Sequence, residues 1–174
     1  MSKEFRRQLT LFIKSRDAVL IEQIRKEYNP KQFELIKSHV TLCREDEIEN
    51  IDLVLFNLSR LKIKEIQIEF DKLVRFDNDK GLMLHAKECI AFEELRHQIL
   101  KGIIKEPRKQ EPHITLMHPR NSLCTDDIYD KINNLNLTQK LIFDTISLIE
   151  QKNIGKWELR EEFKLEKDDN ILHS

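Results

Sequence analysis

One sequence pattern constrains the fold of this chain more than any other, because it occurs twice. Residues 39–42 read His-Val-Thr-Leu and residues 113–116 read His-Ile-Thr-Leu, with the two histidines 113 − 39 = 74 residues apart. Since side chains alternate between the two faces of a strand, each copy places its histidine and threonine on one face and its apolar residues on the other. We therefore expect two equivalent strands facing each other across a cleft, each presenting an imidazole and a hydroxyl.

The four polar side chains of the two copies suit the cleavage of a phosphate ester. Histidine can take or give a proton near neutral pH, because its reference pKa is ~6.5. One neutral and one protonated imidazole on opposite sides of phosphorus would act as base and acid, with a bell-shaped pH profile. Threonine hydroxyls can donate hydrogen bonds to the non-bridging phosphate oxygens. We expect catalysis without metal ion or cofactor by His39, His113, Thr41 and Thr115.

Composition agrees with one compact domain and excludes several other classes. The 174 residues are 40% hydrophobic, which is enough for a core, and no segment has the composition of a linker. The 30 lysines and arginines against 31 acidic residues give a net charge of −1, which does not indicate a general nucleic-acid binder. A protein that holds one nucleic-acid end needs only a local basic patch. The 3 glycines form no glycine-rich phosphate loop, which excludes P-loop and dinucleotide-binding proteins.

Cysteine usage and hydropathy indicate where the protein works. The 3 cysteines are an odd number without a C-x-x-C motif, which argues against a disulfide framework or a zinc site. No segment approaches the ~18 apolar residues of a membrane span, and residues 9–13 are too short and too mixed for a signal-peptide core. We expect a cytoplasmic protein with no membrane contact and no stable protein partner. Cys43 would share the strand face of His39 and Thr41 if that strand continues unbroken.

Hydrophobic periodicity predicts alternating strands and helices. Strands are predicted at the second motif, ending before Pro119, and at residues 8–14, 36–43, 66–76, 82–87, 141–150 and 157–165. Helices are predicted from a cap at Ser15 or Asp17 to the break at Asn29-Pro30, and at residues 48–61, 91–101 and 125–135. The order is that of a loosely duplicated α+β unit, and hairpins between the helices favour antiparallel or mixed sheets.

The paired motifs resemble the signature of the two-histidine (2H) phosphoesterase superfamily, which includes the 2′-5′ RNA ligase-like proteins and the RNA 2′,3′-cyclic phosphodiesterases. That signature is two His-x-Thr/Ser-x motifs, one in each half of the chain, and both are complete here. The resemblance implies that residues 1–174 form one domain of two pseudo-symmetric lobes, with helices on the outside and a central cleft carrying the two His-x-Thr strands.

The same resemblance implies a substrate and roles for the histidines. The substrate would be an RNA end or a small cyclic nucleotide, with a 2′,3′-cyclic phosphate or a 2′-5′ linkage. Some members of the superfamily also join RNA ends in the reverse direction. By analogy with the superfamily, His113 would be the base and His39 the acid.

Two other functions stay open at this point. A non-catalytic module would hold a nucleotide or an RNA end in the same cleft without turnover. A metal-dependent hydrolase would lose activity with a chelator, although no H-x-x-x-H or H-x-H spacing supports it.

A few further side chains are candidates for the edge of the cleft. Arg44 and Arg120 follow the two motifs in loops, where each could reach a phosphate or simply be solvated. His118 comes five residues after the second motif histidine, so strict alternation places it on the opposite strand face, in a structural role. Phe12 and Trp157 could stack a base at the mouth of the cleft or pack in the core.

Overall fold

The computed structural model describes residues 4–173, which form eight strands, five α-helices and one short 3-10 helix. The strands are β1 (Phe5–Phe12), β2 (His39–Cys43), β3 (Ile66–Phe76), β4 (Gly81–Ala86), β5 (His113–Met117), β6 (Gln139–Phe143), β7 (Thr145–Lys152) and β8 (Trp157–Lys164). The helices are α1 (Val19–Tyr28), α2 (Pro30–Leu35), α3 (Ile51–Ser59), α4 (Ile90–Ile99) and α5 (Asp126–Asn133), and the 3-10 helix is η1 (Glu45–Glu47). Within this described part, no helix has the length and apolar character needed to cross a membrane.

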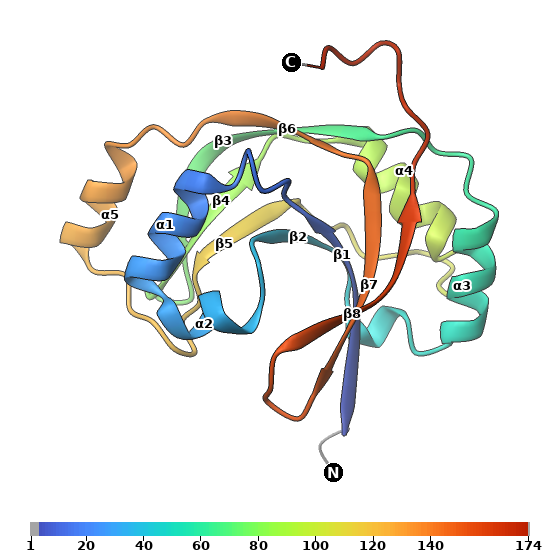
Figure 1. The fold of residues 1–174 in the computed structure, drawn as a ribbon, viewed down its shortest axis with the longest axis horizontal. Helices are drawn as coiled ribbons and strands as arrows, with labels where there is room; N and C mark the ends of the chain where they lie inside the picture. Colours follow the sequence, from blue (N-terminus) through green and yellow to red (C-terminus); the bar gives the residue numbers. More distant parts are fainter. Residues whose placement is uncertain (1–3, 174) are drawn as a thin grey trace.

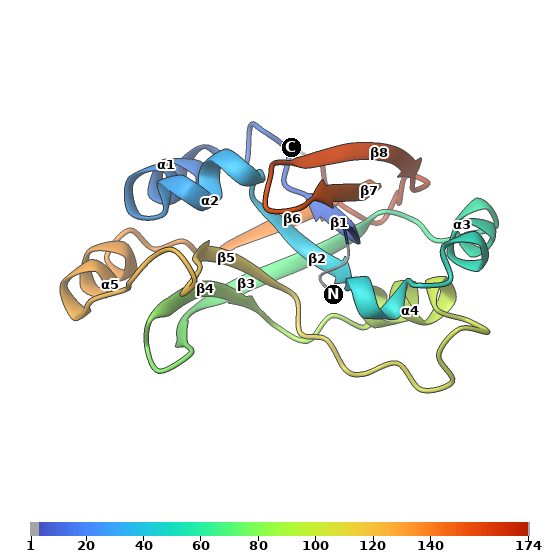
Figure 2. The ribbon, with the colours of Figure 1, turned by 90° about the horizontal axis from the view of Figure 1, so that it is seen from below.

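All eight strands belong to one antiparallel sheet in the order β6-β3-β4-β5-β2-β1-β7-β8. Figures 1 and 2 show that the sheet is strongly curved, with α1, α2 and α5 gathered toward one end of the molecule and α3 and α4 toward the other. The expected α+β class with an antiparallel sheet is therefore confirmed. The two motif strands, however, are neighbours at the centre of one sheet, and do not face each other from separate sheets.

The sheet order divides into two halves of four strands that meet between β2 and β5. A strand–helix–strand unit runs β1–α1–β2 in one half and β4–α4–β5 in the other. The helices cross over between the halves, because α1 contacts β5 and α4 contacts β2. Each motif strand is therefore supported by both halves of the chain.

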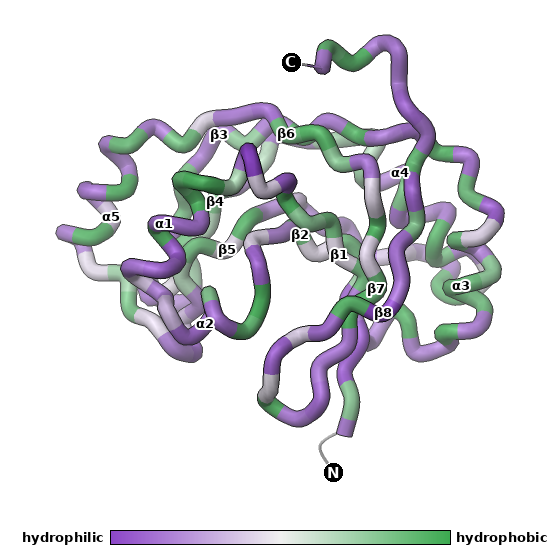
Figure 3. The backbone as a smooth tube through the Cα atoms, in the orientation of Figure 1, coloured by the Kyte–Doolittle hydropathy of each residue, from purple (hydrophilic) through white to green (hydrophobic). Residues whose placement is uncertain are grey.

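The apolar residues of the two motifs lie at the centre of the hydrophobic core. Val40, Leu42, Ile114 and Leu116 are all 0% exposed, and Figure 3 shows apolar residues gathered along the central strands. Burying one such side chain contributes ~1.5–3 kcal/mol. These buried apolar side chains fix the register of the motif strands, since a slip by one residue would turn the histidines and threonines into the core.

One predicted strand is two strands in the structure. Residues 141–150 are divided at Asp144 into β6, which pairs with β3, and β7, which pairs with β1 and β8. Figure 1 shows β6 and β7 following one another along the rim of the curved sheet. Asp144 is held at this junction by Lys14, whose Nζ lies 2.8 Å from the carboxylate. Apolar residues continue across the junction, so hydrophobic periodicity alone does not reveal it.

The helices also differ from the prediction in two places. Pro30 begins the helix α2, where only the end of a helix was predicted, because proline at a first helical position loses no intrahelical hydrogen bond. Helix α1 has no side-chain cap, so the predicted cap at Ser15 or Asp17 is wrong. At α5 the predicted start is confirmed, since Thr125 Oγ1 accepts a hydrogen bond from the backbone N–H of Ile128 at 3.2 Å.

Candidate active site

The centre of the candidate site is a rectangle of four side chains on two neighbouring strands. β2 and β5 pair antiparallel through the central apolar residue of each motif, so His39 lies across from Thr115 and Thr41 lies across from His113. The two histidines therefore occupy opposite corners. Diagonal neighbours of this kind in an antiparallel pair typically lie ~7–8 Å apart, measured between their backbone positions. All four side chains are half-buried and line one cavity of about 590 Å³. The structure thus brings together the four residues that the sequence analysis selected.

The alternation of side chains breaks directly after each motif. In β5 the pairing with β4 shifts between Thr115 and Met117, so Leu116 is an extra, bulged residue. The bulge leaves both Leu116 and Met117 buried and turns His118 back to the cavity, which it lines. The prediction that His118 lies on the face opposite to His113 is therefore wrong, because it assumed an unbroken strand.

β2 has the same break, since its pairing with β1 shifts between Thr41 and Cys43. Cys43 is 0% exposed and packs in the core, so its predicted place on the face of His39 is wrong. Burial raises the pKa of the Cys43 thiol to about 12, which keeps it protonated. The next residue, Arg44, lines the cavity, at the position that corresponds to His118 in the other half.

Both motif histidines are held by the backbone two residues before them. His39 Nδ1 lies 2.8 Å from the carbonyl oxygen of Lys37, and His113 Nδ1 lies 3.0 Å from the carbonyl oxygen of Glu111. A carbonyl oxygen can only accept, so each Nδ1 carries the proton in these contacts. Each Nε2 is left as the ring nitrogen that can take or give a proton, as acid–base catalysis requires.

Burial makes both imidazoles difficult to protonate in the ligand-free site. It lowers the pKa of His39 to about 4, opposed by the hydrogen bond to Lys37, while the charges of Arg25 and His113 lower it further. Burial also lowers the pKa of His113, opposed by its hydrogen bond to Glu111. An anion bound between the two rings would raise both pKa values, because it stabilises the protonated forms. The site therefore favours binding of an anionic group together with a proton.

The two histidines have different neighbours on the strands outside them. Phe12 on β1 is the cross-strand partner of His39, and the two rings meet edge to face with centroids 6.1 Å apart. His85 on β4 is the corresponding partner of His113, and His85 Nε2 lies 2.7 Å from Glu111 Oε2. Phe12 thus packs against a motif histidine and, unlike Trp157, does not line the cavity. The backbone arrangement is duplicated, whereas the charges around the two rings are not.

Two glutamines that carry no motif signal also belong to the site. Gln8 Nε2 donates to Thr41 Oγ1 at 3.0 Å, which uses a lone pair of the hydroxyl and leaves its proton available for a ligand. Gln110 Nε2 donates to the Thr41 carbonyl at 2.9 Å. Both glutamines line the cavity. Sequence analysis missed them because an isolated glutamine on a strand or in a loop is indistinguishable from a surface residue.

Arg25 on α1 is the most notable residue that sequence analysis missed. It is only 1% exposed, yet it lines the cavity. Its guanidinium donates to Glu22 Oε1 at 2.6 Å and to the carbonyl of Ile36 at 2.7 Å, while its Nε has no hydrogen-bond partner within residues 4–173. The contacts with Glu22 and Ile36 therefore hold the Arg25 guanidinium in a fixed position at the wall of the cavity.

A repeated pattern in the sequence could have revealed Arg25. Residues 21–25 (Ile-Glu-Gln-Ile-Arg) and 92–96 (Phe-Glu-Glu-Leu-Arg) occupy corresponding parts of α1 and α4. The second arginine, Arg96, is fully buried and donates to both oxygens of Glu47 at 2.7 and 3.1 Å. It also donates to the Leu42 carbonyl at the bulge of the first motif strand. Arg96 therefore supports the strand, whereas Arg25 faces the cavity.

The cavity is rich in cations although the whole chain is nearly neutral. Arg6, Arg44 and Arg120 line it, and within residues 4–173 none of their guanidinium groups forms an ion pair with a carboxylate. Glu45 and Asp46 also line it, and Asp46 is paired with an arginine outside the cavity at 2.6 Å. The two loop arginines, Arg44 and Arg120, thus line the same cavity as the motif histidines. Across this same described range, no three His, Cys, Asp or Glu side chains cluster as metal ligands.

Comparison with known proteins agrees with this arrangement. The family model of the 2′-5′ RNA ligase superfamily matches residues 13–155, which is most of the chain. The protein therefore belongs to the 2′-5′ RNA ligase superfamily, and the relationship predicted from the paired motifs is confirmed. No curated protein matches the chain by sequence.

Solved structures of low sequence identity share the fold over nearly the whole chain. Ligand-free E. coli LigT superposes with a TM-score of 0.67 at 13% identity, covering 95% of this chain and 100% of LigT. E. coli LigT complexed with 3′-AMP gives a TM-score of 0.63 at 14% identity, covering 94% and 99%. A structure described as a phosphoesterase gives 0.65 at 14% identity, covering 95% and 100%. The curved antiparallel sheet is therefore the fold of these proteins.

Proposed function

We propose that the protein is a phosphodiesterase that opens RNA-type 2′,3′-cyclic phosphates by acid–base catalysis. The observation that supports this most strongly is the rectangle of His39, Thr41, His113 and Thr115, with the imidazoles at opposite corners. In the proposed reaction, water gives a proton to one imidazole and attacks phosphorus. The P–O bond to one ribose oxygen breaks on the opposite side, and that oxygen takes a proton from the other imidazole. One water is consumed and a phosphomonoester is formed.

The remaining side chains of the cavity have supporting roles in this proposal. Thr41 and Thr115, at the other two corners, donate hydrogen bonds to the non-bridging oxygens and stabilise the charge that develops there. The guanidinium groups of Arg25, Arg44 and Arg120 attract the anionic substrate into the cavity. The step needs no metal ion and no cofactor.

The proposed substrate is an RNA end or a small cyclic nucleotide. The 3′-AMP bound to E. coli LigT supports a nucleotide as ligand of a cavity of this kind. The same two imidazoles could run the reverse reaction, in which a ribose hydroxyl attacks a cyclic phosphate to form a 2′-5′ linkage. We also propose that one domain spanning residues 1–174 acts by itself, in the cytoplasm.

A substrate screen tests the proposal. Purified protein is incubated with 2′,3′-cyclic nucleotides and 2′-5′-linked dinucleotides, with and without a chelator, alongside His39→Ala and His113→Ala. We expect chelator-resistant turnover that both substitutions abolish. Binding without turnover would favour a non-catalytic module for nucleotides or RNA ends. Loss of activity with the chelator would favour a metal-dependent hydrolase.

A further inference from the structure

The cavity extends from the two motifs to a tryptophan on β8. Trp157 is half-buried and lines the cavity together with Arg6, whose guanidinium carbon lies 5.2 Å from the centre of the indole ring system. Arg6 Nε donates to Gln151 Oε1 at 3.1 Å, and Gln151 Nε2 donates to the carbonyl of Gly155 at 2.7 Å. Gln151 is only 4% exposed. The pair of Arg6 and Trp157 is therefore held in place by buried contacts on β1, β7 and the turn before β8.

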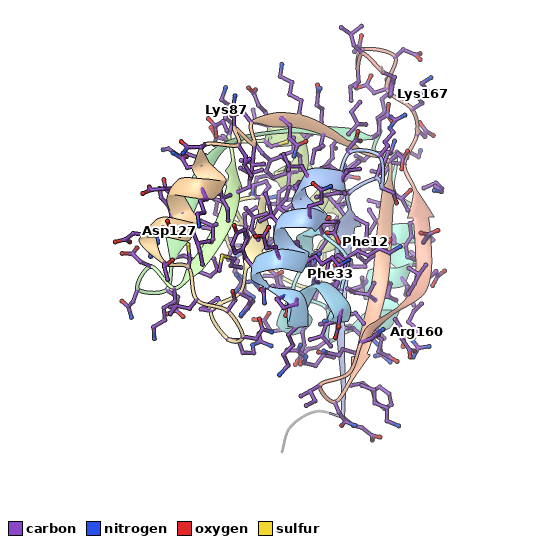
Figure 4. The ribbon with its side chains drawn as sticks, turned by 60° about the vertical axis from the view of Figure 1, so that its left-hand side comes forward. Phe12, Phe33, Lys87, Asp127, Arg160 and Lys167 are labelled. Carbon is purple, nitrogen blue, oxygen red and sulfur yellow. The ribbon has the colours of Figure 1, made fainter. Side chains whose placement is uncertain are left out.

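A second cavity, of about 470 Å³, lies next to the first one. The two cavities share three residues, Leu35, Ile36 and Trp157. The second cavity is lined further by apolar side chains from three segments, including Ile13, Val19 and Phe33, and Figure 4 shows Phe33 on α2. The junction between the cavities thus brings one aromatic side chain and two aliphatic side chains together.

This junction lies close to the first motif in the chain. Ile36 comes three residues before His39, and Lys37 and Ser38 between them line the second cavity. The first cavity is lined both by the two motif histidines and by the three residues of the junction, so a ligand with its phosphate between the histidines can extend to the junction. The large flat part of such a ligand would meet the indole of Trp157 and the side chains of Leu35 and Ile36 there.

We infer that the junction is a nucleobase subsite, in which the base of the bound nucleotide stacks on the indole of Trp157 with Leu35 and Ile36 beside it. The inference rests on the proposed function only for the position of the phosphate. Every base has an aromatic face, and stacking on an aromatic side chain is tolerant of sequence. The subsite therefore selects nucleotides over phosphate esters that lack a base, and it accepts purines and pyrimidines alike. The Arg6 guanidinium, 5.2 Å from the indole, keeps a positive charge near the ligand.

Indole fluorescence tests this subsite without any need for turnover. Trp157 is the only tryptophan of the chain, so the signal reports on this side chain alone. We expect 3′-AMP to quench the fluorescence in a saturable manner, and inorganic phosphate and glycerol 2-phosphate to leave it unchanged when they saturate the site. The inference is overturned if 3′-AMP binds without a change in fluorescence, or if the two probes without a base quench it equally.

Steady-state kinetics give a second test with matched variants. Trp157→Leu should raise KM for adenosine 2′,3′-cyclic phosphate by about tenfold or more, as loss of one base–aromatic stack does, with kcat little changed. Trp157→Phe should stay close to the unmodified protein, and KM for glycerol 1,2-cyclic phosphate should be the same in all three proteins. An equal rise of KM for both substrates in Trp157→Leu, or no rise for either, contradicts the subsite. Saturable quenching by 3′-AMP without any turnover would instead contradict the proposed function and leave the subsite standing.

Discussion

The half of the cleft around His39 and the half around His113 share a backbone but differ in what surrounds the histidine. Both motif strands have the same burial pattern and the same bulge after the motif. His39 is packed by Phe12, whereas His113 lies beside the pair formed by His85 and Glu111. The duplication places the two rings symmetrically, and the different neighbours allow the rings to have different protonation states. A reaction that needs one base and one acid requires two rings with different protonation states.

The two buried arginines show the same divergence. Arg96 donates to both oxygens of Glu47 and to backbone carbonyls, and it does not line the cavity, so it contributes to the fold. Arg25 also has an ion-pair partner, Glu22, but it lines the cavity. Corresponding positions of α1 and α4 thus carry arginines with different surroundings, one at the cavity and one inside the core.

The largest expected effect comes from removing either imidazole. His39→Ala and His113→Ala should each lower kcat by ~10²–10⁴-fold, since each removes one proton-transfer step. The matched control is His97→Ala, because His97 is exposed on α4 and does not line the cavity. Full activity in either motif variant would contradict the account.

A substrate with an aryl leaving group sharpens this comparison, because such a group departs without protonation. The variant that lacks the acid should recover most of its activity on an aryl phosphodiester, whereas the variant that lacks the base should not. Analogy with the superfamily makes His39 the acid. The low pKa of His39 in the ligand-free site favours His39 as the base, so the rescue experiment decides between two opposite assignments.

The next effect separates the two arginines by stability. Arg96→Met should lower the free energy of unfolding by up to ~3–5 kcal/mol, because it breaks a fully buried ion pair and leaves Glu47 only the half-exposed Arg108 as cationic partner at 3.2 Å. Arg25→Met should cost less, since the Glu22 side chain is 24% exposed whereas that of Glu47 is 2% exposed, and it should mainly reduce kcat/KM. Denaturant unfolding and steady-state kinetics on both variants check this. The distinction fails if the two variants lose the same stability and keep the same activity.

A smaller effect is expected from the two hydroxyls. Thr41→Val and Thr115→Val should each reduce kcat/KM by ~10–150-fold, corresponding to the ~1.5–3 kcal/mol of a hydrogen bond to a charged group. The shape of the side chain is kept, so circular dichroism should be unchanged. If only one of the two variants loses activity, the threonines do not act symmetrically on the phosphate oxygens.

The smallest effect is a difference in pH dependence between kcat/KM and kcat. Because kcat/KM reports the free enzyme, it should fall below pH about 4, where His39 becomes protonated. It should also fall as the pH rises toward 6.5, because the pKa of His113 lies below this ordinary value. The profile of kcat should lie at higher pH, since the bound anion raises both pKa values.

His85→Phe tests whether the neighbours of the motif histidines set the pH profile. The substitution gives His113 a phenylalanine as cross-strand partner, as His39 already has in Phe12. It removes the contribution of His85, which lowers the pKa of His113, and keeps that of Glu111, which raises it, so the pKa of His113 should rise. The upper limb of the kcat/KM profile should therefore move to higher pH while the lower limb stays. Movement of the lower limb alone would contradict the assignment of these groups.

The sequence predicted the paired strands, the α+β class and the four motif residues because these depend on local alternation. It could not place Cys43 and His118, because a bulge after each motif reverses the alternation and depends on pairing with a neighbouring strand. It missed α2, because Pro30 stops one helix and starts another. Arg25 was missed because its role follows from burial against the cavity, which only the folded chain defines.

The central claim is that both imidazoles reach one phosphorus atom, and nitrogen NMR of the histidine rings tests it most directly. A nucleoside vanadate, which imitates in-line displacement at phosphorus, is titrated into the protein. The account predicts that the Nε2 signals of His39 and His113 shift together at one equivalent, with a higher pKa for both rings and no change at His97. A response from only one of the two motif histidines, or from neither, would contradict it.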